Sequence, residues 1–288
     1  MTASRLGCSS ISFRHLDLPD ALAAMAKLGF TEIDLGSLPG VCDHVPLDLD
    51  RAGIARVVGA VRDSGLTVRS INVDVGDLND PRMRMHDSEH LFRLLELAAV
   101  LEAKAIVLPN GALEHTPMTD LDDDLLRVAD NLEFVLDRGR LLGVDLWVES
   151  LHVWRLCCNH TRAAALTERL HPDIGIVMDF SHIVASGGDP VDFVQDTAGR
   201  IAHVHIRDAL RGHVQLDTDP ISDRPGNINL SVGRGDVDFA SGLRALDAAG
   251  YGGHFTLELE TRDVTDDERP AATAAAAQNI GELLTFAA

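Results

Sequence analysis

The sequence predicts an α/β fold, a (β/α)8 TIM barrel in which eight parallel strands form the barrel and helices lie outside it. Short apolar runs typical of buried strands alternate eight times with amphipathic segments typical of helices. No Ser/Gly-rich linker divides the chain, so we expect one domain over residues 1–288, a length at which such barrels are single domains. Polar side chains also end each of the last four expected strands.

The expected strands are short runs rich in Val, Ile, Leu and Thr, and each is followed by a segment of helical periodicity. The strands cover residues 6–13, 30–36, 66–73, 105–109, 144–149, 174–180, 201–208 and 254–260. The helices are expected near 18–28, 48–64, 82–102, 120–142, 160–170, 190–197, 236–249 and 271–286. Because strands that alternate with helices pair in parallel, eight such units favour a closed barrel.

Several element boundaries carry local chemical signals. Pro19 stands at the start of the first expected helix, where its missing N–H costs nothing. Gly65 and Gly143 each follow an expected helix just before a strand, as glycine does at helix ends. In the GRGD segment, we interpret Asp236 as the cap of the next helix. Residues 209–234 form the longest stretch without periodicity and are predicted to be an active-site loop.

Composition excludes several classes of protein. With 45% hydrophobic and 4% aromatic residues, the chain can bury a large aliphatic core. The net charge of −20 repels phosphate backbones and anionic lipid, so we expect no nucleic acid and no membrane partner. No stretch is apolar enough to span a bilayer, and the N-terminus lacks the apolar core of a signal peptide, which predicts a cytoplasmic protein. The four cysteines form no CxxC pair and are expected to be reduced.

The run IAHVHIRD (201–208) is unusually polar for a buried strand. Alternate side chains of a barrel strand point inward, and those near its carboxyl end reach the face where such enzymes keep their sites. We therefore expect His203, His205 and Arg207 to point inward and the apolar residues between them, from Ala202 on, to face the helices. His203 lies deeper and is interpreted as structural.

The same alternation turns one carboxylate inward at the end of each of three other strands. Four consecutive strands then deliver metal-competent side chains to one mouth, namely Glu149, Asp179, His205 and Glu258. Three carboxylates so close together would repel one another unless a cation lay among them. Three oxygen ligands and one imidazole suit Mn²⁺ or Mg²⁺ best, with Co²⁺ or Zn²⁺ as alternatives. The alternative for each residue is an ion pair or a loop cap.

Four segments carry a resemblance to a known family. WVES (147–150), MDFSH (178–182), HVHIRD (203–208) and YGGHFTLELE (251–260) resemble, in order and spacing, the sugar phosphate isomerase/epimerase superfamily of xylose isomerase-like TIM barrels. That superfamily includes keto-sugar 3-epimerases, inosose dehydratase and an apurinic endonuclease branch. The resemblance runs over nearly the whole chain, and the strongly negative charge argues against the endonuclease branch.

The resemblance implies roles for individual residues. It implies a metal held by Glu149, Asp179, His205 and Glu258. In the epimerase branch, Glu149 and Glu258 also form a catalytic acid/base pair, and His182 and Arg211 match residues that bind substrate. A lysine is common two positions after the metal histidine in the dehydratase-like branch; Arg207 keeps that charge here and is a further expected substrate contact.

These observations predict a metal-dependent sugar or sugar phosphate isomerase/epimerase of carbohydrate metabolism, working by proton transfer through a metal-stabilised enediolate. Two alternatives stay open: a metal-dependent dehydratase of a keto-polyol, like inosose dehydratase, and a non-catalytic sugar-binding barrel. The expected partner is a small carbohydrate. The sequence leaves open the sugar, its stereochemistry, its phosphorylation and the oligomeric state.

Overall fold

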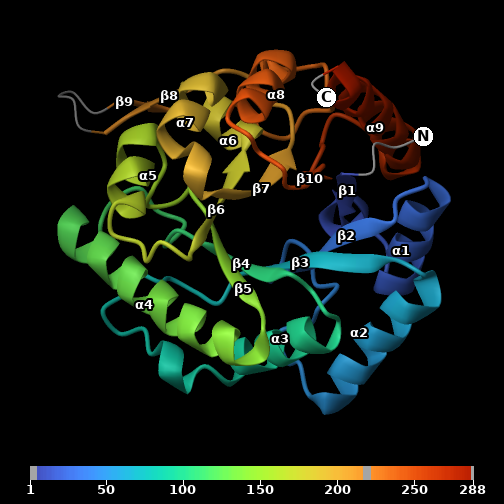
Figure 1. The fold of residues 1–288 in the computed structure, drawn as a ribbon, viewed down its shortest axis with the longest axis horizontal. Helices are drawn as coiled ribbons and strands as arrows, with labels where there is room; N and C mark the ends of the chain where they lie inside the picture. The colour runs from blue at the N-terminus through green and yellow to red at the C-terminus, as the bar shows by residue number, and fades with distance from the viewer. Residues whose placement is uncertain (1–4, 217–221, 287–288) are drawn as a thin grey trace.

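A computed structural model describes residues 5–216 and 222–286 of the chain. Eight parallel strands close into a barrel in the order β1-β10-β7-β6-β5-β4-β3-β2, with helices around it (Figure 1). The strands are β1 Leu6–Ser9, β2 Glu32–Ser37, β3 Thr67–Val73, β4 Ala105–Pro109, β5 Asp145–Glu149, β6 Gly175–Asp179, β7 Ile201–Ile206 and β10 Phe255–Leu257. The predicted (β/α)8 TIM barrel is confirmed.

The helices pack their apolar faces on the outside of this barrel. They are α1 Leu18–Lys27, α2 Arg51–Ser64, α3 Glu89–Val100, α4 Leu121–Leu142, α5 His160–Thr167, α6 Phe180–Ala185, α7 Pro190–Thr197, α8 Phe239–Ala248 and α9 Arg269–Phe286. Gly65 and Gly143 end α2 and α4 with φ of 72° in both cases, the left-handed conformation that glycine adopts without strain. Within the described ranges, none of these helices combines the length and apolarity needed to cross a membrane.

Several expected boundaries were wrong. Residues 10–13 form a 3-10 helix, since the Ser9 side chain accepts a hydrogen bond from the Ile11 amide and turns the chain after β1. The helix expected from residue 82 begins at Glu89, where Ser88 provides the cap. Asp238, not Asp236, caps α8, because its carboxylate accepts from the Ser241 amide.

The segment after β7 contains an element that the sequence did not predict. Strands β8 His213–Gln215 and β9 Ser222–Arg224 pair antiparallel, apart from the barrel. Of the predicted 209–234 loop, residues 217–221 lie outside the described residues.

One side chain expected to face the helices lies inside the barrel. The pairing of β6 with β7 shifts so that Ile176 lies opposite Ile201 and Val177 opposite His203. Ala202 is therefore the extra residue of a bulge and packs on the interior cluster that contains Trp147. A bulge of this kind depends on strand pairing and leaves no mark in the hydrophobic pattern.

The interior bulge makes Gly175 a sensitive position. A Cβ at Gly175 would lie 2.6 Å from Trp147 Cδ1 and closer still to Ala202 Cβ. We expect Gly175→Ala to lower the free energy of unfolding by about 1–3 kcal/mol through overpacking. Gly59→Ala is the matched control in the middle of α2, where a Cβ meets nothing within 4 Å, and should raise it by about 0.5–1 kcal/mol. Urea unfolding of both variants checks this, and equal effects would contradict it.

Candidate active site

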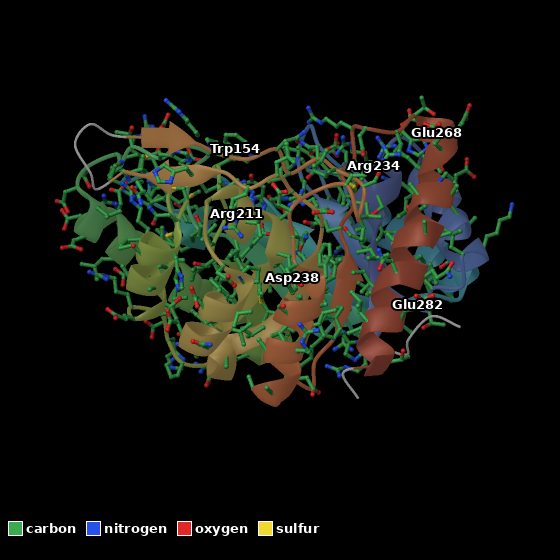
Figure 2. The ribbon with its side chains drawn as sticks, turned by 90° about the horizontal axis from the view of Figure 1, so that it is seen from above. Trp154, Arg211, Arg234, Asp238, Glu268 and Glu282 are labelled. Carbon is green, nitrogen blue, oxygen red and sulfur yellow. The ribbon has the colours of Figure 1, made fainter. Side chains whose placement is uncertain are left out.

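A cavity of about 390 Å³ opens at the carboxyl ends of the barrel strands. Its lining includes Asn72, Glu149, Arg207 and Glu258, which lie at or just beyond the ends of β3, β5, β7 and β10. Trp154, 42% exposed, also lines it. Figure 2 shows Trp154 at the same end of the barrel as Glu268, just before α9 begins, and Glu282 toward the opposite end. The cavity thus lies on the face where barrel enzymes carry their sites.

The four residues predicted as metal ligands converge at this mouth. One donor atom from each lies within 4.8 Å of a donor atom of the other three. Barrel pairing explains the convergence, since Asp179 lies opposite His205, and His205 lies opposite Thr256, two residues before Glu258. His205 Nδ1 faces both glutamates, at 3.3 Å from Glu149 Oε1 and 3.4 Å from Glu258 Oε2.

Arg207 is buried at the centre of this cluster, with only 3% of its surface exposed. Its Nη2 donates to Asp179 Oδ2 at 2.9 Å and lies 3.4 Å from Glu258 Oε2. Its Nη1 lies 3.3 Å from Glu260 Oε1, and the other oxygen of Glu260 accepts from Arg14 at 3.0 Å. A single guanidinium therefore offsets part of the negative charge of three carboxylates.

Burial and charge act against each other on the ionisable groups of this cluster. Burial raises the pKa of the Glu258 carboxyl, and the charges of His205 and Arg207 offset only part of that rise. Burial also opposes charge on His205, but the carboxylates of Glu258 and Glu149 outweigh it and raise the pKa of this imidazole. For Asp179, burial also opposes the charge, but Arg207, His205 and the hydrogen bond from Ser181 together outweigh burial and lower the pKa of the carboxyl. Cations and anions therefore alternate through the cluster.

Two of the predicted substrate-binding residues, His182 and Arg211, lie in different positions relative to the cavity. His182 is buried beside the cavity, with its Nε2 2.9 Å from Arg207 Nη2 and its ring 3.9 Å from that of His152, which lines the cavity. Burial, with Arg207 adding to the effect, holds the pKa of His182 well below its usual range, so its ring is neutral. Arg211 is not brought to the cavity, because its guanidinium donates to the carbonyl groups of Gly187 and Gly188.

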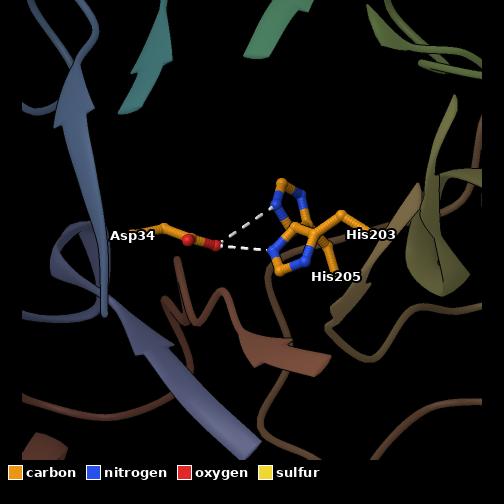
Figure 3. A group of neighbouring side chains, drawn as sticks. All are labelled: Asp34, His203 and His205. Atoms are coloured by element: carbon orange, nitrogen blue, oxygen red, sulfur yellow. Dashed lines mark hydrogen bonds and ion pairs between the residues drawn. The ribbon is translucent and has the colours of Figure 1, made fainter. Parts of the chain in front are cut away.

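Asn72 and Asp34 are among the polar residues of the site that the sequence analysis missed. Asn72 at the end of β3 donates to Glu258 Oε1 at 2.7 Å. Asp34 on β2 is fully buried, and its Oδ2 lies 2.8 Å from His203 Nε2 and 3.8 Å from His205 Nε2 (Figure 3). The same alternation that singled out the last four strands also turns these two inward, so it would have found them if applied to the second and third strands.

A family model described as xylose isomerase-like TIM barrel matches residues 22–283. The chain belongs to this family. The predicted superfamily is therefore confirmed.

Individual members resemble the chain at low sequence identity. Inosose dehydratase from Lacticaseibacillus casei is 28% identical over 144 residues, which cover 48% of this chain and 48% of that protein. The match thus spans about half the length of that relative. The structure of L-ribulose 3-epimerase has a TM-score of 0.76 at 21% identity and covers 99% of this chain and 96% of that one. The structure of the IolI protein with a bound zinc atom has a TM-score of 0.74 at 17% identity, covering 96% and 98%.

The position of Arg207 predicts a large effect on stability. Arg207→Met would leave the buried Asp179 and Glu258 and the half-buried Glu260 without their shared cation, so we expect the metal-free protein to lose about 3–5 kcal/mol of unfolding free energy. Arg211→Met is the matched control, since this exposed guanidinium donates to the backbone carbonyl groups of Gly187 and Gly188, and it should cost about 1 kcal/mol or less. Urea unfolding in EDTA measures both, and similar losses would show that the buried charges do not depend on Arg207.

Proposed function

We propose that this protein is a divalent-metal-dependent enzyme that moves a proton at the carbon beside a sugar ketone, as isomerases and epimerases do. One observation carries the proposal: four consecutive barrel strands deliver three carboxylates and one imidazole to a single cluster, and two of its members, Glu149 and Glu258, line the cavity. The relatives and structural neighbours include an L-ribulose 3-epimerase and a zinc-bound IolI protein, which supports this choice.

The charge of the cluster suits a divalent cation. The carboxylates of the cluster, with Glu260, carry four negative charges, and the guanidinium groups of Arg207 and Arg14 compensate two of them. A divalent cation beside a neutral His205 would compensate the remaining two. The donor set of three oxygens and one nitrogen is compatible with Mn²⁺ or Mg²⁺, and also with Co²⁺ or Zn²⁺. We propose Glu149, Asp179, His205 and Glu258 as its ligands.

A bound cation would supply the positive charge that polarises a substrate carbonyl and acidifies the neighbouring C–H group. Glu149 and Glu258 are proposed as the groups that exchange the proton, since both line the cavity and flank His205. Burial already raises the pKa of Glu258 toward the range in which a carboxyl both gives and takes a proton near neutral pH. Asn72 holds the second oxygen of Glu258, which fixes the direction of its carboxylate.

The cavity suits a small polyhydroxylated substrate. Its deep end is polar, with Asn72 and Arg207, while its rim carries the exposed apolar side chains of Val41, Leu113 and Trp154. Sugars commonly combine hydroxyl hydrogen bonds with an apolar face, and pockets of this size hold small molecules. We propose that Arg207 orients substrate hydroxyl groups and that His182, fully buried against its guanidinium, holds Arg207 in place for this contact, and we leave Arg211 out of the substrate site.

A dehydratase is the second candidate. The likeness to inosose dehydratase favours it, as does the basic residue Arg207 two positions after His205. Such an enzyme would begin with the same proton removal and then lose a hydroxyl group as water. Both candidates share the ligand set and the base, so only their products separate them.

Solvent exchange tests the proton transfer. Protein reconstituted with Mn²⁺ should incorporate deuterium from D₂O into at least one member of a panel of ketoses and keto-polyols, as NMR would show. Glu258→Gln should reduce the rate by about 10²–10⁴-fold, because the proton acceptor is lost. Glu282→Gln, toward the opposite end of the barrel (Figure 2), should leave it unchanged.

Mass spectrometry of the products separates the two candidates. An isomer keeps the mass of the substrate, whereas a dehydrated product is lighter by one water. A lack of exchange and of water loss across the panel, in protein that binds Mn²⁺, would contradict both and favour a sugar-binding barrel.

A further inference from the structure

We infer that Asp34 is a positioning residue that holds the His205 ring with Nε2 protonated and Nδ1 turned toward Glu149 and Glu258. This inference rests on the proposed metal site. Asp34 lies on β2, a strand that carries none of the four proposed ligands, and the inference gives it a part in forming that site.

The His205 ring lies between two groups of carboxylates. Its Nδ1 faces Glu149 and Glu258 at 3.3 and 3.4 Å, and its Nε2 faces Asp34 Oδ2 at 3.8 Å (Figure 3). Nε2 is fully buried, and no hydrogen-bond partner for it occurs in the part of the chain that the structure describes. The ring and the Asp34 carboxylate are both 0% exposed, so no solvent screens their interaction.

The carboxylate of Asp34 decides which nitrogen of His205 keeps its proton. At 3.8 Å the contact is electrostatic rather than a hydrogen bond. A lone pair on Nε2 would face a buried negative charge and be repelled, whereas an N–H there is attracted. Nδ1 is then the nitrogen that can give up its proton and act as a metal ligand, as a carboxylate behind a ligating histidine commonly ensures.

His203 and Trp147 hold Asp34 and the ring in this arrangement. His203 Nε2 lies 2.8 Å from Asp34 Oδ2, and the His203 ring stacks on Trp147 with centroids 5.1 Å apart. The ring of His203 also meets that of His205 edge-on, at 5.2 Å and 88°. The oxygen of Asp34 that contacts His203, Oδ2, is also the oxygen that faces His205 Nε2. A purely structural alternative is that Asp34 serves His203 alone.

Two variants separate these roles. Asp34→Asn removes the charge behind His205 and nearly keeps the side-chain shape, and should weaken Zn²⁺ binding about 10–100-fold, the effect typical of losing such a partner. His203→Gln removes the other imidazole but keeps a donor toward Asp34, and should change the Zn²⁺ dissociation constant less than threefold. Asp124→Asn is the matched control for stability. Its carboxylate is equally buried and bonds Asn79 and Thr119, so it should lower stability without changing Zn²⁺ affinity.

A spectroscopic measurement keeps the inference testable if Asp34→Asn fails to fold. In Zn²⁺-loaded wild-type protein labelled with ¹⁵N-histidine, NMR should show His205 with the proton on Nε2. A proton on Nδ1, or wild-type Zn²⁺ affinity in Asp34→Asn, would overturn the inference while leaving the metal site intact. A wild-type protein that binds no Zn²⁺ would overturn the proposed function and this inference together.

Discussion

Negative charge buried at one end of the barrel is the constraint on which this site depends. Asp179 and Glu258 are almost fully buried, and taking carboxylates out of water is costly unless cations lie beside them. Arg207 meets this need by contacting Asp179, Glu258 and Glu260 at once, and His205 lies beside both Glu258 and Glu149. The same crowding that requires these cations is the basis of the divalent-metal site that we propose.

Barrel geometry makes the crowding unavoidable. Parallel strands all end at the same face, and period-two alternation turns the last inward side chain of each strand toward a common axis. Asp179 and His205 lie opposite each other on β6 and β7, Glu149 lies opposite Val177 on the neighbouring β5, and Glu258 follows β10. On the opposite side, Asp34 and Asn72 from β2 and β3 contact the same groups from behind. Six strands of the barrel thus contribute to one cluster.

The alternation of apolar and polar residues predicted the strands, the helices and the direction of most strand side chains. The eight strands, most helices and the convergence of four side chains follow from alternation, and Asn72 and Asp34 carry the same signal. The interior position of Ala202 could not be predicted, because the bulge arises from strand pairing. The position of Arg211 depends on how its loop folds onto neighbouring carbonyl groups. Asp236 and Asp238 both precede α8, and only the backbone path selects Asp238 as its cap.

Anomalous diffraction from crystals grown with Mn²⁺ tests the central claim most directly. The account predicts one strong peak within ligand distance of Glu149, Asp179, His205 Nδ1 and Glu258, with His205 held by Asp34 from the other side. The absence of a peak among these four side chains would contradict the account, whether Mn²⁺ binds at another place on the protein or does not bind at all. The cluster would then be a polar network that Arg207 and His205 neutralise without a metal.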